Sequence, residues 1–63
     1  MNIQVGDLIT HAYWDFSADT LVIPDRTKTF TVTKVEKAIS GYSDYLYHTV
    51  EGSTFSDMCC IKI

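Results

Sequence analysis

Short runs in which apolar and polar residues alternate, separated by turn-forming residues, make up most of the chain. No stretch keeps the i, i+3, i+4, i+7 apolar spacing of an amphipathic helix for long enough to indicate one. The pattern therefore predicts an all-β fold. The first strand is expected to enter through a bend at Gly6-Asp7 and to continue through residues 8–14, LITHAYW.

The clearest strand signal is KTFTVTKVE, at residues 28–36. Phe30 and Val32 fall on one face of this strand, and the threonines between them fall on the other. Val35 breaks the alternation. Such a slip in phase predicts a β-bulge or a sharp bend, which small barrels use to close.

The segments on either side of this strand predict turns and shorter strands. DFSADTLVIPDRTK, at 15–28, contains the single proline and several turn-forming residues, and indicates a long excursion with one short apolar segment, 21–23. The second half predicts a turn around Gly41, a strand at 44–50, a tight hairpin at Glu51-Gly52, one 3₁₀ turn at 56–58 and a last strand at 59–63. The predicted core consists of Val5, Leu8, Phe30, Val32, Leu46, Val50, Phe55 and Ile61.

Composition limits the class of protein. The 63 residues allow a single domain, 1–63, which buries only about 60% of the surface of its unfolded chain. A net charge of -3 is too acidic for a phosphate-binding surface and too mild for a mimic of DNA, so a partner other than nucleic acid is favoured. Because the sequence contains neither a leader-like segment nor an apolar run of about 20 residues, we expect a cytoplasmic protein that does not span a membrane.

The order of elements, five short strands with a long first loop and two hairpins, resembles that of an SH3-like β-barrel. AYWDFSADT, at 12–20, is similar to the Ala-Leu-Tyr-Asp-Tyr/Phe stretch that opens eukaryotic SH3 domains. VGDLIT, at 5–10, resembles the first strand of small bacterial and phage SH3-like proteins. The resemblance implies a five-stranded SH3-like barrel with one 3₁₀ turn before the last strand. It also suggests a phage or mobile-element protein that binds or inhibits a host protein.

The chain departs from those SH3 domains that bind proline-rich peptides. Such domains need a tryptophan at the start of the third strand and a late Pro-Ser-x-Tyr turn, because flat aromatic rings form the peptide grooves. Here these places hold Tyr45 and FSDMCC, at 55–60. The resemblance therefore implies the fold without proline-peptide binding.

Cys59 and Cys60 are adjacent, so strand alternation directs one of them into the core and the other to solvent. Packing as small apolar residues is the main interpretation. A nucleophilic thiol would need a neighbouring cation, for which only Lys62 is close, and a metal site would have to recruit His11 or His48. Because no C-x-x-C spacing is present, we expect no metal and no cofactor.

The eight large aromatic rings exceed what so small a domain can bury. Alternation places Tyr13 and Trp14 on opposite sides, so one of these rings is directed outward. Tyr45 and Tyr47 share one face of their strand. They face outward, beside Trp14 or Phe16, if Leu46 and His48 face inward, and the opposite arrangement is equally open.

These patterns predict a non-enzymatic module that binds another protein. Asp15 and Asp19 suit turn geometry and could also attract a basic partner. Single-stranded nucleic-acid binding, with tyrosines stacked on bases, is the alternative, although cations are few. An enzyme is not expected, because a domain of this size has little depth for a desolvated cleft. The predicted partner-binding residues are Tyr13, Trp14, Asp15, Phe16, Asp19, Tyr45 and Tyr47.

Overall fold

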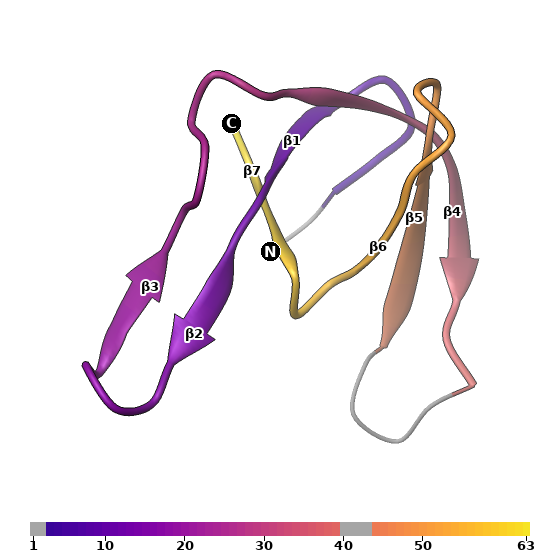
Figure 1. Ribbon diagram of the computed structural model, residues 1–63. Helices are drawn as coiled ribbons and strands as arrows, with labels where there is room; N and C mark the ends of the chain where they lie inside the picture. Colours follow the sequence, from indigo (N-terminus) through magenta and orange to yellow (C-terminus); the bar gives the residue numbers. More distant parts are fainter. Residues whose placement is uncertain (1–2, 40–43) are drawn as a thin grey trace.

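The computed structural model of the protein describes residues 3–39 and 44–63. These residues form β-strands joined by turns, and they contain no helix that is long and apolar enough to cross a membrane. The strands are β1 (Leu8–His11), β2 (Tyr13–Asp15), β3 (Thr20–Val22), β4 (Phe30–Lys37), β5 (Tyr45–Thr49), β6 (Thr54–Ser56) and β7 (Cys60–Lys62) (Figure 1). The predicted all-β class is confirmed, whereas the turn expected around Gly41 lies outside the described residues.

In the part of the chain that the structure describes, the strand pairs are antiparallel and form two sheets. Five strands form one sheet in the order β6-β5-β4-β1-β7, and β2 with β3 forms a separate two-stranded sheet. This second sheet lies on the excursion between β1 and β4 and extends to one side of the molecule (Figure 1). Within the described strands, β6 and β7 are the two edges of an open sheet, so the predicted closed barrel is not found.

β4 bends at the position where the sequence predicts a bulge. Val32 pairs with Thr49 and Lys34 pairs with His48, and the register shifts between these two pairs. The first residues of β4 pair with β1, and the strand then continues along β5. In Figure 1, β4 accordingly crosses the top of the molecule before it turns down beside β5. The bulge thus lets one strand pair with both halves of the sheet.

The core is small and centred on β1, β4, β5 and β7. Ile3, Ile9, Val32, Tyr47 and Cys60 form the buried cluster, and Phe30, Val35 and Phe55 pack against it. Val32 is therefore buried as predicted, while Leu46 and Ile61 are only half-buried.

Val5, Leu8 and Val50 are exposed, so their predicted places in the core are wrong. Val5 lies in a turn with Gly6, whose φ of 93° is in the left-handed region that favours glycine. Gly6 N donates to Val32 O at 2.8 Å, so the backbone of this turn packs on β4 and leaves Val5 outside. Leu8 is the first residue of β1, and Val50 lies in the turn that follows β5.

Two turns within residues 44–63 lie where the sequence predicts them. Gly52 has a φ of 89°, and its N–H donates to Thr49 O at 3.0 Å, which closes the hairpin between β5 and β6. The buried Thr49 hydroxyl also donates to Ser53 O at 2.9 Å. A single turn, closed by the hydrogen bond from Cys59 N to Ser56 O at 3.0 Å, stands where the 3₁₀ turn was expected.

Candidate functional site

The hairpin of β2 and β3 holds most of the predicted binding residues. Trp14 pairs with Leu21 and Asp15 pairs with Thr20, which fixes the register of the hairpin. At its tip, one Asp15 carboxylate oxygen accepts hydrogen bonds from Ser17 N at 2.9 Å and from Ala18 N at 3.3 Å. Asp15 thus serves the turn geometry that its sequence position predicts.

The hairpin exposes apolar side chains on both faces and at its tip. Trp14 and its cross-strand partner Leu21 lie on one face, where the Trp14 side chain is 46% exposed to solvent. Tyr13 lies on the opposite face and is also exposed. Phe16, at the tip, is 84% exposed. We call Tyr13, Trp14, Phe16 and Leu21 the hairpin patch.

A row of rings connects the hairpin patch to the core. The centroid of the His11 ring lies 5.9 Å from that of Tyr13 and 6.0 Å from that of Phe55. The Phe55 ring lies 4.9 Å from Phe30, at the edge of the core. His11 Nδ1 donates to Cys59 O at 3.0 Å, which fixes the imidazole between the two aromatic rings. The base of the hairpin is therefore anchored, while its tip projects.

The other predicted binding residues do not join this patch. Tyr47 is only 2% exposed, so of the two orientations that alternation left open, the one that faces the core is correct, and Tyr47 is too buried to act as the predicted binding residue. Burial raises the pKa of its hydroxyl. Tyr45 is exposed at the start of β5, which lies on a different side of the molecule from β2 (Figure 1). Asp19, with a φ of 52°, remains on the hairpin.

The adjacent cysteines divide as predicted, with Cys59 exposed and Cys60 buried. Burial raises the pKa of the Cys60 thiol to about 11. The thiol donates to Ser56 O at 3.4 Å. Cys60 is therefore a protonated core residue at neutral pH. Among residues 3–39 and 44–63, no three His, Cys, Asp or Glu side chains gather in a group that could hold a metal ion.

We expect iodoacetamide to alkylate Cys59 in the native protein and to spare Cys60. At about pH 8 a thiol with the raised pKa of Cys60 has roughly a hundredfold less thiolate than an ordinary cysteine. Intact-mass spectrometry should show one adduct in native buffer and two in denaturant, and Cys59→Ser should remove the native adduct. Rapid double labelling of the native protein would contradict the burial of Cys60.

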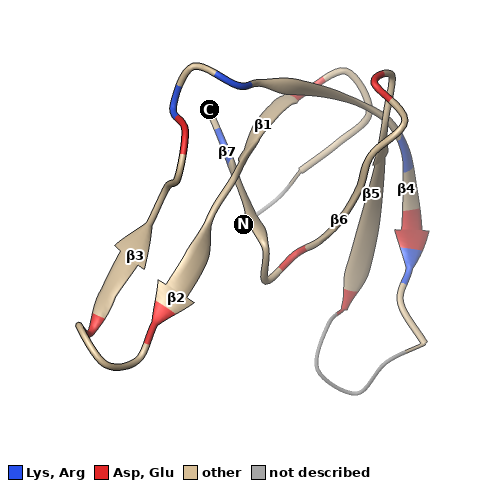
Figure 2. Ribbon diagram, in the orientation of Figure 1, with Lys and Arg blue, Asp and Glu red and all other residues tan. Residues whose placement is uncertain are grey.

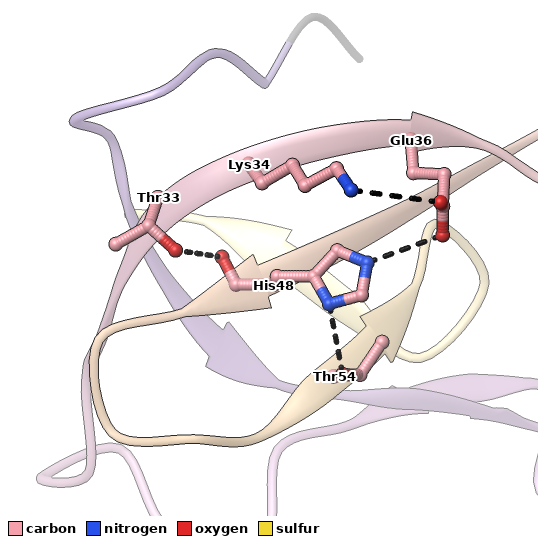
Figure 3. Close-up of polar contacts among 5 residues, drawn as sticks. All are labelled: Thr33, Lys34, Glu36, His48 and Thr54. Atoms are coloured by element: carbon pink, nitrogen blue, oxygen red, sulfur yellow. Dashed lines mark hydrogen bonds and ion pairs between the residues drawn. The ribbon is translucent and has the colours of Figure 1, made fainter.

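A polar cluster of Thr33, Lys34, Glu36, His48 and Thr54 lies on β4, β5 and β6 (Figure 3). His48 Nε2 lies 3.2 Å from a Glu36 oxygen, and the Thr54 hydroxyl lies 3.3 Å from His48 Nδ1. Hydroxyl, imidazole and carboxylate also occur in this order at nucleophilic sites. Here, however, the His48 and Glu36 side chains are 35% and 46% exposed on a sheet surface, where water competes for each contact. The arrangement links three strands.

Glu36→Gln is expected to reduce the loss of stability in acid. The hydrogen bond from His48, followed by the charge of Lys34, holds the pKa of Glu36 below its ordinary value of 4.5. The stability that depends on the Glu36 carboxylate is therefore present above pH 4.5 and lost as the pH falls through the lower folded value. Urea midpoints measured across this range should fall less in Glu36→Gln than in the wild type. Asp19→Asn is the control and should lose stability in acid as the wild type does. If the urea midpoint of Glu36→Gln fell in acid as much as that of the wild type, the stabilising role of the Glu36–His48 pair would be contradicted.

The fold thus places the exposed residues of the hairpin patch on one hairpin, with Trp14 and Leu21 on one face and Tyr13 on the other. Leu21 is the member that the sequence did not indicate. Comparison with protein-family models, curated proteins and solved structures finds no match to this chain. Proposals about its function therefore rest on its own residues.

Proposed function

We propose that the protein is a non-enzymatic module that binds another protein through the hairpin patch. The observation that carries this proposal is the joint exposure of Tyr13, Trp14, Phe16 and Leu21 on one hairpin. Aromatic side chains, tryptophan above all, supply much of the affinity at protein interfaces. Exposed apolar side chains gathered on a projecting hairpin are expected of a surface that contacts another protein.

The architecture that we propose for this module is SH3-like. The long excursion between β1 and β4, the hairpins of β4–β5 and β5–β6, and the turn before β7 support it. The pairing of the first strand with the last, with His11 opposite Cys60, supports it further. Binding of proline-rich peptides is not part of the proposal, because the chain lacks the tryptophan and the Pro-Ser-x-Tyr turn that form those grooves.

The charge of the hairpin indicates the chemistry of the partner. Asp15 ends β2 and Asp19 precedes β3, and Figure 2 shows this acidic end of the hairpin apart from the basic residues. Such a surface favours a partner that combines an apolar groove with basic side chains. It repels phosphate, which weighs against binding of single-stranded nucleic acid.

Capture of the partner from a lysate of the source organism tests the proposal. Proteins retained by the wild type, and identified by mass spectrometry, should be lost when Trp14 and Phe16 are both replaced by alanine. Val50→Ala is the matched control, because Val50 is an exposed apolar residue outside the hairpin. Equal retention by all three proteins would contradict the proposal. Tight, steeply salt-dependent binding to a single-stranded oligonucleotide would favour the alternative function.

A further inference from the structure

A second candidate surface lies away from the tip of the hairpin. It is a pocket of about 270 Å³ between β1, β7 and the connection from β3 to β4. We call it the isoleucine pocket, and it is lined by Thr10, Ile23, Arg26, Ile61, Lys62 and Ile63.

Hydrogen bonds hold the wall of this pocket in place. The buried Thr10 hydroxyl donates to Lys28 O at 2.8 Å, which fastens the β3–β4 connection to β1. The Asp25 carboxylate accepts from Thr27 N at 2.9 Å and also from the Thr27 hydroxyl. Asp25 is therefore engaged in its own turn, and its side chain does not line the pocket.

The lining combines aliphatic side chains with positive charge. Three isoleucines supply the apolar surface, Arg26 and Lys62 supply two cations, and none of the six lining residues is Asp or Glu. Lys62 Nζ lies 3.4 Å from an Asp7 oxygen, whereas Arg26 has no ion-pair partner within residues 3–39 and 44–63. Figure 2 shows basic residues on both the β3–β4 connection and β7. Arg26 is therefore the lining cation that can offer its charge to a ligand, because Lys62 already pairs with Asp7.

The volume indicates what the pocket can hold. At about 270 Å³ it falls just below the roughly 300–1,000 Å³ of pockets that enclose drug-sized ligands. It suits one or two side chains of a bound polypeptide better than a cofactor. A carboxylate is the natural complement of the Arg26 guanidinium, and an aliphatic side chain is the complement of the isoleucines.

We propose that the isoleucine pocket binds an acidic, aliphatic segment of a partner protein. An aliphatic side chain of that segment packs on Ile23, Ile61 and Ile63, and an adjacent carboxylate reaches Arg26. This surface prefers a partner of the opposite charge from the one that the hairpin patch attracts, so the two surfaces can contact different regions of a partner.

Titration of ¹⁵N-labelled protein with the peptide acetyl-Leu-Glu-Leu-Glu-amide tests the proposal. Saturable shifts are expected at the amides of Thr10, Ile23, Arg26 and Ile61, and they should weaken as salt is added. The matched probe, acetyl-Leu-Gln-Leu-Gln-amide, should bind about two- to fivefold more weakly, as expected for a partly exposed ion pair. Absence of shifts at these amides, or equal affinity for both peptides, would overturn the proposal.

Two charge variants sharpen the test. Arg26→Gln should lose about two- to fivefold in affinity for the glutamate peptide. Lys37→Gln removes the same charge from β4, outside the pocket, and should bind like the wild type. Equal losses of peptide affinity in the two variants would mean that net charge alone causes the effect, and this would overturn the assignment of the peptide to the pocket. Shifts of the pocket amides that depend on protein concentration in the absence of peptide would also overturn it, because they would identify a second copy of the chain as the occupant.

Trp14→Ala distinguishes this proposal from the proposed function. The substitution should leave binding of the glutamate peptide unchanged, because Trp14 does not line the pocket. Loss of peptide binding in this variant would place the peptide on the hairpin patch and overturn the pocket assignment. If lysate capture fails while the pocket shifts persist, only the function proposed for the hairpin fails.

Discussion

Ile9→Ala is expected to unfold most of the protein at 25 °C. Ile9 is 0% exposed and lies on β1, where it pairs with Phe30 on one side and with Lys62 on the other. Truncating a buried isoleucine to alanine costs about 2–5 kcal/mol in the free energy of unfolding. A domain of this size rarely has more than about 3–5 kcal/mol in total. Circular dichroism during a urea titration should therefore show a large unfolded fraction before urea is added.

Leu8→Ala is the control for this prediction. Leu8 precedes Ile9 on the same strand, but its side chain is exposed, so its truncation should shift the urea midpoint only slightly. A larger loss of stability in Leu8→Ala than in Ile9→Ala would mean that β1 presents its other face to the core. Ile9→Ala that unfolds at the wild-type midpoint would remove Ile9 from the core.

Trp14→Ala is expected to remain folded and to lose at least about thirtyfold in affinity for the captured partner. The side chain of Trp14 is nearly half exposed, and among the described strands β2 pairs with β3 alone, so its removal leaves no large cavity in the core. An interface anchor of this kind typically contributes 2 kcal/mol or more, which corresponds to about thirtyfold. Isothermal titration calorimetry against the purified partner gives the affinities.

Two further measurements make the Trp14 result decisive. Trp14 is the single tryptophan of the chain and is nearly half exposed, so iodide should readily quench the tryptophan fluorescence of the wild type. Val50→Ala, which truncates another exposed apolar residue, should retain wild-type affinity. Unchanged affinity in Trp14→Ala would contradict the anchor role, and an unfolded variant would show that the indole stabilises the fold instead.

The sequence could predict the bend of β4 because Val35 breaks the alternation that Phe30 and Val32 establish. It could not determine which face of β5 is buried, because both sets of alternating residues in this strand contain large apolar side chains. The outcome depends on tertiary neighbours: Phe55 lies opposite Tyr47, and Cys60 belongs to the same buried cluster. Strand period therefore indicates two faces, but not which one is covered.

The candidate site was predictable only where its residues are adjacent in sequence. Tyr13, Trp14 and Phe16 lie within one short segment, so any turn near Asp15 keeps them together. Leu21 was missed because its position beside Trp14 depends on the register of the hairpin. The expected grouping of Tyr45 and Tyr47 with Trp14 required the relative placement of two separate sheets, which local alternation does not contain.

The pairing of β1 with β7 has a consequence for how the chain folds as it is synthesised. Ile9 pairs with Lys62, so β1 keeps one unpaired edge until almost the whole segment has left the ribosome. Closing so long a loop costs entropy before any contact of β7 compensates for it, which slows folding. During this interval the open edge of β1 is a template for strands of other nascent chains. Expression at lower temperature, or with a chaperone that shields exposed strands, should therefore raise the yield of monomer more than any change to the mature surface.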